Sequence, residues 1–238
     1  MALKGHTIEF ELFPRRTLHV VLFRGVRNAA ALAASVAARE DVVAGLSLLN
    51  FRMLCGPLHL LAAANKALIA QSSRMVTRSL QQELVYALSA SRNVSETSRI
   101  FGVSAEEQDG DDNGGGRAGT DLVLACRFDA PDAAAAEREM EAVVEGTVVS
   151  LGGGRGADGS GLALLAAPQA LLAEVRAEAA AGTGPRLAMD GELEFGCDMH
   201  LRKVFKLQGE KEVGDLSTAV GREQLQHAVV LRLATKES

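Results

Sequence analysis

The order of apolar and polar residues near the start of the chain predicts two strands, a helix and a third strand. Thr7–Leu12 alternates polar with apolar residues, which is typical of a half-buried strand. Leu18–Phe23 is more fully apolar and predicts a second strand, with Pro14–Arg16 between them in a hairpin or tight connection. An Ala-rich helix is expected at about Asn28–Ala38, and a short strand at Leu46–Leu49.

The central part of the chain predicts three successive helices. Pro57 suits the first position of a helix, where the missing N–H has no cost, and apolar residues follow it at three- and four-residue steps. Thr77 or Ser79 is the expected cap of the next helix. Ser95 is the expected cap of a short third helix, which would end at Gly102.

Beyond these helices, segments with strand or helix patterns alternate with segments rich in Gly and Ala. A buried strand is expected at Asp121–Cys126, and Asp132 is expected to cap a helix that follows it. Thr147–Leu151 is either another strand or a turn. Residues 105–119 have too little apolar surface to repay the entropy of ordering, so they predict a disordered loop. Residues 152–198 read as a Gly/Ala-rich insertion that is partly helical.

The last expected element is a helix between about Leu216 and Thr235. Its apolar residues Leu225, Val229 and Leu233 recur at four-residue steps, and neighbouring apolar residues widen the arc beyond one face. A wide apolar arc indicates contact with more than one neighbour. Two interpretations remain open: the helix binds a partner protein, or it packs into its own core.

The charge of the central part differs from that of the whole chain. The net charge is −5, yet no acidic residue lies between Asp41 and Glu83. The basic residues of this interval are Arg52, Lys66, Arg74 and Arg78. An uncompensated basic segment indicates a docking place for an anionic partner. Solvation of helix ends by long basic side chains is the alternative explanation.

Motifs for catalysis, metals and nucleotides give mostly negative results. Gly154–Gly159 contains a literal G-x-G-x-x-G, but in so glycine-rich a segment a flexible insertion is the better interpretation. Asp109–Thr120 opens like a calcium loop but has no Glu at its twelfth position. The cysteines are widely spaced and do not cluster with the histidines, which is typical of reduced thiols; they are Cys55, Cys126 and Cys197. We therefore predict a binding protein with no enzymatic activity, no cofactor and no metal.

The sequence also bears on location. The N-terminus has no signal-peptide pattern, and no segment reaches the roughly 20 apolar residues that span a bilayer. We therefore expect a cytoplasmic and nuclear protein.

Several stretches resemble one known family when taken together. They are Leu12–Pro14, Leu18–Phe23, Val26–Ala29, His59–Ala67, Thr77–Ser89, Asn93–Glu96, Phe101–Val103, Val204–Leu207 and Arg232–Lys236. The pattern resembles the TPRKB family, the small subunit of the KEOPS (EKC) complex that binds the PRPK-type kinase. The resemblance covers about 1–104, 121–151 and 199–238.

This resemblance implies an α/β fold with a compact mixed β-sheet and surrounding helices. It implies a single domain over residues 1–238, in which 105–119 and 152–198 are insertions that shorter members lack. It also implies a non-catalytic role in making threonylcarbamoyl-adenosine in tRNA. The subunit would bind the kinase, support its ATPase activity, reach other KEOPS subunits through the kinase, and help recruit tRNA.

The two lines of reasoning give candidate site residues. Lys66, Arg74 and Arg78 are the candidates for tRNA phosphate contacts, although Arg78 could instead pair with a neighbour on its own helix. The candidates for kinase binding are Leu225, Val229 and Leu233, helped by the helix that begins at Pro57. The competing functions are a nucleotide-binding enzyme that uses Gly154–Gly159, and a scaffold subunit without RNA contact.

Overall fold

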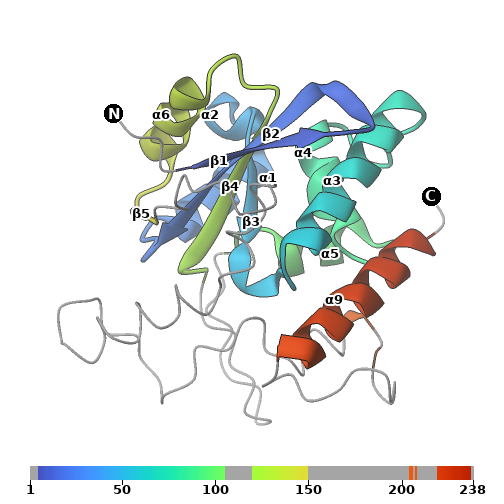
Figure 1. Cartoon of the computed structure of the whole chain (residues 1–238). Helices are drawn as coiled ribbons and strands as arrows, with labels where there is room; N and C mark the ends of the chain where they lie inside the picture. Colours follow the sequence, from blue (N-terminus) through green and yellow to red (C-terminus); the bar gives the residue numbers. More distant parts are fainter. Residues whose placement is uncertain (1–4, 105–119, 150–203, 206, 208–218, 237–238) are drawn as a thin grey trace, which may run out of the picture.

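A β-sheet with helices on both faces forms the centre of the protein (Figure 1). The computed structural model describes residues 5–104, 120–149, 204, 205, 207 and 219–236. The strands are β1 (His6–Phe10), β2 (Phe13–Arg24), β3 (Ser47–Asn50), β4 (Leu122–Phe128) and β5 (Thr147–Val149). The helices are α1 (Ala29–Ala38), α2 (Asp41–Ala44), the 3-10 turn η1 (Phe51–Met53), α3 (Pro57–Ser72), α4 (Leu80–Ala87), α5 (Val94–Phe101), α6 (Ala133–Val143) and α9 (Ala219–Ala234).

The strands follow the order β1-β2-β4-β3, and β5 also pairs with β2. The long strand β2 pairs with β4 from Leu18 opposite Phe128 to Arg24 opposite Leu122. The predicted α/β class, a sheet with surrounding helices, is confirmed. The resemblance implied a mixed sheet, whereas every pairing between the described strands is antiparallel. The short β1–β2 connection requires the antiparallel arrangement of that pair, because a tight hairpin can only join antiparallel strands.

Each face of the sheet has its own apolar core. Leu18, Val20 and Leu22 of β2 belong to the core that also contains residues of α3, α4, α5 and α9. Val21 and Phe23 point the other way, into the core that contains residues of α1, α2 and α6. Successive strand residues point to opposite faces, and both faces are covered, so β2 is apolar at every position from Val20 to Phe23. This explains the continuous apolar run of these four residues in the sequence.

Most helix starts lie where the sequence places them. Pro57 is the first residue of α3, and Ser79 and Asp132 cap α4 and α6 by accepting hydrogen bonds from backbone N–H groups. The prediction that Ser95 caps α5 was wrong, because Asn93 stands immediately before the helix and its side chain accepts the capping hydrogen bond. Asn and Ser are about equally good caps, so the residue that stands immediately before the first helical residue takes the role.

The connection between the first two strands also differs from the prediction. We expected Pro14 to end the first strand, but β2 already begins at Phe13. The register shifts there: Glu9 pairs with Thr17, and Phe10 pairs with Phe13. Pro14 therefore lies in a bulge, where a strand tolerates proline because no ladder hydrogen bond has to be given up.

Some predictions fall outside the described residues. They are the loop at 105–119, the insertion at 152–198 and the G-x-G-x-x-G match at Gly154–Gly159. Phe205 and Leu207 are described, and both are buried in the core on the α3 face. None of the described helices is both long enough and apolar enough to cross a membrane.

Candidate functional site

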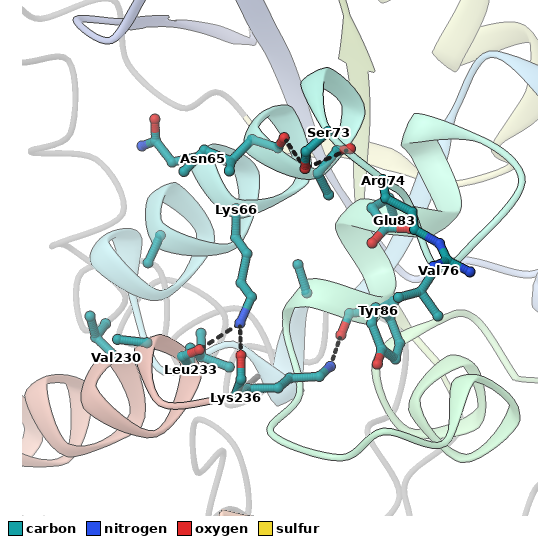
Figure 2. Close-up of a pocket in the computed structure, with 15 residues that line it drawn as sticks. Asn65, Lys66, Ser73, Arg74, Val76, Glu83, Tyr86, Val230, Leu233 and Lys236 are labelled. Carbon is teal, nitrogen blue, oxygen red and sulfur yellow. Dashed lines mark hydrogen bonds between the residues drawn. The ribbon is translucent and has the colours of Figure 1, made fainter. Parts of the chain in front are cut away.

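Helices α3, α4 and α9 enclose a groove of about 370 Å³ (Figure 2). One wall is α3, another is α4 with the segment before it, and the third is the end of α9 with the residues after it. Its lining includes Lys66, Arg74, Glu83, Tyr86, Leu233 and Lys236.

Lys66 extends from α3 toward the C-terminal end of α9. Its Nζ donates hydrogen bonds to the carbonyl oxygens of Leu233, at 2.7 Å, and Lys236, at 2.8 Å. The last carbonyls of a helix have no partner within the helix and form the negative end of its dipole, so they suit an ammonium group. Burial lowers the pKa of Lys66. Lys66 therefore acts as a clamp between α3 and α9.

Lys236 makes the reciprocal attachment, from the end of α9 to α4 (Figure 2). Its Nζ donates to the carbonyl oxygens of Tyr86 and Ser89, each at 3.0 Å. The same Nζ lies 3.3 Å from the centroid of the Tyr86 ring, a cation–π contact. Burial, followed by repulsion from Lys66, lowers the pKa of Lys236 to about 8. Lys236 is thus a buried cation held by carbonyl oxygens and a ring.

The groove has an excess of positive charge. Glu83 is the carboxylate among its lining residues, and its Oε2 accepts hydrogen bonds from the N–H of Thr77, at 2.7 Å, and from the Thr77 hydroxyl, at 2.6 Å. Within the described residues, no carboxylate contacts the ammonium group of Lys66 or Lys236. Cations without paired acids favour an anionic ligand.

The predicted phosphate-binding residues are not all in this groove. Lys66 and Arg74 line it, whereas exposed Arg78 lies in the segment before α4 and outside the lining. In the described part of the chain, neither arginine makes a hydrogen bond or an ion pair, so Arg78 does not pair with its helix neighbours. The fourth cation of the acid-free interval, Arg52, holds Asp121 through two hydrogen bonds of 2.8 Å.

The predicted kinase-binding residues of α9 are all buried within this chain. Leu225, Val229 and Leu233 are in the core that α9 shares with α3. They have no surface to offer a partner in this arrangement, so a role in kinase binding would be indirect, through the position of α9. The opposite side of α9 is exposed, with Val220 at 63% and Leu231 at 67%.

The other end of the α3–α9 contact is also fixed by a polar contact. Gln226 of α9 accepts a hydrogen bond of 3.1 Å from the N–H of Leu58, in the first turn of α3. Gly56 precedes that turn with φ of 148°, and a Cβ there would lie 2.2 Å from the Gln226 side-chain oxygen. Glycine is therefore favoured at Gly56 by its backbone conformation, and a larger residue there would also displace the Gln226 side chain.

A buried histidine lies in the core beside α3. His59 Nδ1 accepts a hydrogen bond from the N–H of Cys55, at 3.2 Å, and its Nε2 lies 2.9 Å from the carbonyl oxygen of Leu88. This pairing requires the neutral ring with its proton on Nε2, because a carbonyl oxygen can only accept. Burial lowers the pKa of His59 to about 4. His59 therefore joins segments of the core as a neutral group.

A second groove, of about 410 Å³, lies where the β1–β2 hairpin meets the end of α3. Arg15 and Arg16 line it, but Arg16 pairs with Asp129 at 2.7 Å and donates to Gln71 at 2.7 Å. Its cationic character is therefore weaker than that of the first groove. Among the described residues, no three or more His, Cys, Asp or Glu side chains gather as metal ligands would.

Sequence reasoning missed two residues of the groove between α3, α4 and α9. Tyr86 and Lys236 were assigned no function, although the structure brings them together. Tyr86 reads as one more apolar position of its helix. Lys236 binds backbone carbonyls, and such acceptors leave no signature in a sequence. Only its place just beyond an apolar helix could have drawn attention to it, as a cation near a negative helix end.

Comparison with known proteins identifies the family. The model of the family "Kinase binding protein CGI-121" matches residues 23–158, more than half of the chain. The chain therefore belongs to the CGI-121 family of kinase-binding proteins. This confirms the resemblance to the TPRKB family. Helix α9 lies outside the matched range.

Two curated relatives agree with this assignment. The EKC/KEOPS complex subunit TPRKB of Danio rerio is 35% identical over 99 residues, which cover 41% of this chain and 55% of that protein. The EKC/KEOPS complex subunit CGI121 of Gibberella zeae is 33% identical over 110 residues, covering 46% of this chain and 55% of that protein. The chain thus spans about half the length of the curated relatives it matches.

Proposed function

We propose that this protein is the kinase-binding subunit of an EKC/KEOPS-type complex. In this role it binds a PRPK-type kinase, supports the ATPase activity of that kinase, and helps recruit tRNA for threonylcarbamoyl-adenosine formation without catalysing a step itself. The family description names kinase binding, and the two relatives are named as subunits of that complex.

The observation that supports tRNA recruitment is the unpaired positive charge of the groove between α3, α4 and α9. Arg74 lines the groove, is exposed and has no ion-pair partner among the described residues. Lys66 uses two of its three N–H donors on α9 carbonyls, which leaves one donor for a ligand. Cations without carboxylate partners attract the phosphates of a nucleic-acid backbone.

For kinase binding, the outward side of α9 is the better candidate surface. Val220 and Leu231 project from this side with most of their surface exposed, although the exposed residues between them, such as Glu223 and His227, are polar. Exposed large apolar side chains on a helix are candidate contacts for a partner protein. The buried side of the helix would then serve to hold these two side chains in place.

The tRNA proposal is tested by reversing two exposed cations, Arg74→Glu with Arg78→Glu. The third candidate, Lys66, is left unchanged, because reversing it would also break its two hydrogen bonds to backbone carbonyls at the end of α9 and confuse the result. If both arginines bind phosphates, tRNA affinity falls, and the slope of log affinity against log salt flattens by roughly 0.7–0.9 for each phosphate that is no longer neutralised. Binding is measured by filter binding or fluorescence anisotropy over a salt series.

A matched control carries the same change in net charge elsewhere. Arg99 of α5 and Arg138 of α6 are both exposed, so Arg99→Glu with Arg138→Glu alters the charge by the same amount. We expect this control to keep the salt slope of the wild type. An equal fall in affinity in both variants would mean that only overall charge matters. Unchanged tRNA binding in the Arg74/Arg78 variant would favour a scaffold subunit without RNA contact at this groove.

A further inference from the structure

Two lysines tie the end of α9 to both other walls of the groove. Lys66 connects α3 to the carbonyl oxygens of Leu233 and Lys236, and Lys236 in turn connects the residues after α9 to the carbonyl oxygens of Tyr86 and Ser89. These four hydrogen bonds, together with the buried apolar side of α9 and the Gln226 contact, fix both the position of α9 and the shape of the groove.

These two cations repel each other across the groove. Lys236 is buried, and among the described residues no carboxylate contacts either ammonium group. Repulsion from Lys66 is one of the causes that lower the pKa of Lys236. An anion in the groove would reduce this repulsion. It could bind the third N–H of Lys66 without displacing either carbonyl, because an ammonium group has three donors.

We propose that Lys66 and Lys236 couple the groove to helix α9, so that a tRNA phosphate bound in the groove strengthens the attachment of α9 to α3 and α4. The inference rests on the proposed function, because it takes tRNA as the anionic ligand. By thermodynamic linkage, anything that fixes α9 in its attached position strengthens phosphate binding by the same factor. A kinase bound to the outward side of α9 would do this, since it binds best when that side is held in place.

The coupling makes Lys66 and Lys236 positioning residues, whose effect differs from that of a simple phosphate ligand. Replacing a phosphate ligand such as Arg74 lowers the affinity for tRNA but leaves the response of α9 to bound tRNA intact. Replacing Lys236 removes its hydrogen bonds to Tyr86 and Ser89 and also the second cation whose repulsion the phosphate would relieve, so bound tRNA can no longer strengthen the attachment of α9 through this pair. The two kinds of residue are therefore distinguished by measuring the amide hydrogen exchange of α9 at saturating tRNA.

The test is amide hydrogen exchange of α9 in the full chain, with and without saturating tRNA transcript. Three proteins are compared: wild type, Lys236→Met, which keeps most of the apolar stem and removes the donors, and Arg74→Met as the matched control. In wild type and in Arg74→Met, we expect tRNA to slow exchange along α9 by about fivefold or more, the low end of usual coupling factors. In Lys236→Met, we expect tRNA to leave α9 exchange unchanged.

The outcomes separate the coupling from the proposed function. If tRNA binds wild type but does not slow α9 exchange, or slows it equally in Lys236→Met, the coupling is refuted while RNA binding stands. If tRNA does not bind wild type, the proposed RNA function fails, and the coupling fails with it. Exchange of the β2 and β4 amides shows whether Lys236→Met is folded. Should that variant not fold, Lys66→Met takes its place with the same expected result, and the wild-type comparison can by itself refute the coupling.

Discussion

The two sides of helix α9 predict opposite effects for substitutions only two residues apart. Val229 is fully buried in the core against α3, whereas Leu231 is 67% exposed. We expect Val229→Ala to destabilise the fold and Leu231→Lys to leave it stable but to weaken kinase binding. A single short segment thus tests both the packing of α9 and the proposed kinase surface.

The expected changes in stability follow from how deeply each side chain is buried. Val229→Ala removes two buried methyl groups, worth about 0.8 kcal/mol each, and the cavity raises the destabilisation to about 2–3 kcal/mol. In a protein of this size, each kcal/mol shifts the Tm by roughly 2–4 °C, so the Tm should fall by roughly 4–12 °C. Leu231→Lys replaces one good helix former by another and adds a cation near the negative end of the helix, so stability should change by less than about 0.5 kcal/mol.

The assays are thermal unfolding followed by circular dichroism and kinase affinity measured by biolayer interferometry. We expect Leu231→Lys to weaken kinase binding at least tenfold, about 1.4 kcal/mol, because a charge would be placed in an apolar contact. Val229→Ala should bind the kinase with near wild-type affinity below its Tm. The assignment of the two sides is refuted if Val229→Ala keeps the wild-type Tm, or if it weakens kinase binding more than Leu231→Lys does. The second result would return the kinase contact to the side that is buried here.

Three further outcomes can be checked on the protein alone. Burial lowers the pKa of His59 to about 4 in the folded protein, so below about pH 6.5 the unfolded chain binds one more proton than the folded chain does. The free energy of unfolding should therefore fall as the pH drops from 6.5 towards 4. Urea titrations should show a smaller fall for His59→Gln. Gly56→Ala should lower the Tm, because Ala is strained at this φ, and should speed hydrogen exchange around Gln226 in the middle of α9, since its Cβ would displace the Gln226 side chain. Unchanged exchange around Gln226 would contradict the close approach. Burial raises the pKa of the Cys126 thiol, so iodoacetamide should not label Cys126 until the protein unfolds. Half-buried Cys55 should be labelled in the native protein. Mass spectrometry can distinguish the two sites.

Local signals in the sequence were sufficient for most elements. The cap at Ser79, the cap at Asp132 and the proline at the start of α3 lie where the chain folds as expected. These signals act within one helical turn, so neighbouring residues carry the information. The errors arose where two local interpretations competed. Pro14 was expected to end a strand, but a bulge in the hairpin accommodates it.

The candidate site was harder to predict because it depends on how distant segments meet. The four-residue steps of Leu225, Val229 and Leu233 identified a buried side of α9 but could not tell whether its cover is α3 or another protein. The contact between Lys236 and Tyr86 joins residues 150 positions apart through a backbone carbonyl, which no pattern of side chains reveals. Both contacts could be identified only from the three-dimensional structure.

The basic residues of the acid-free interval differ in the groups that each side chain already contacts. In the sequence, Arg52, Lys66, Arg74 and Arg78 form one basic segment. In the structure, Arg52 binds Asp121, Lys66 binds the end of α9, and the other two make no ion pair among the described residues. A charge already neutralised by a carboxylate adds little to the attraction of a ligand, whereas one held by carbonyl oxygens keeps its net charge, although the carbonyl dipoles weaken its field. The field at the groove therefore comes from Lys66 and Arg74, strengthened by Lys236, and an anion should be drawn to the end of α9 rather than to the basic segment as a whole.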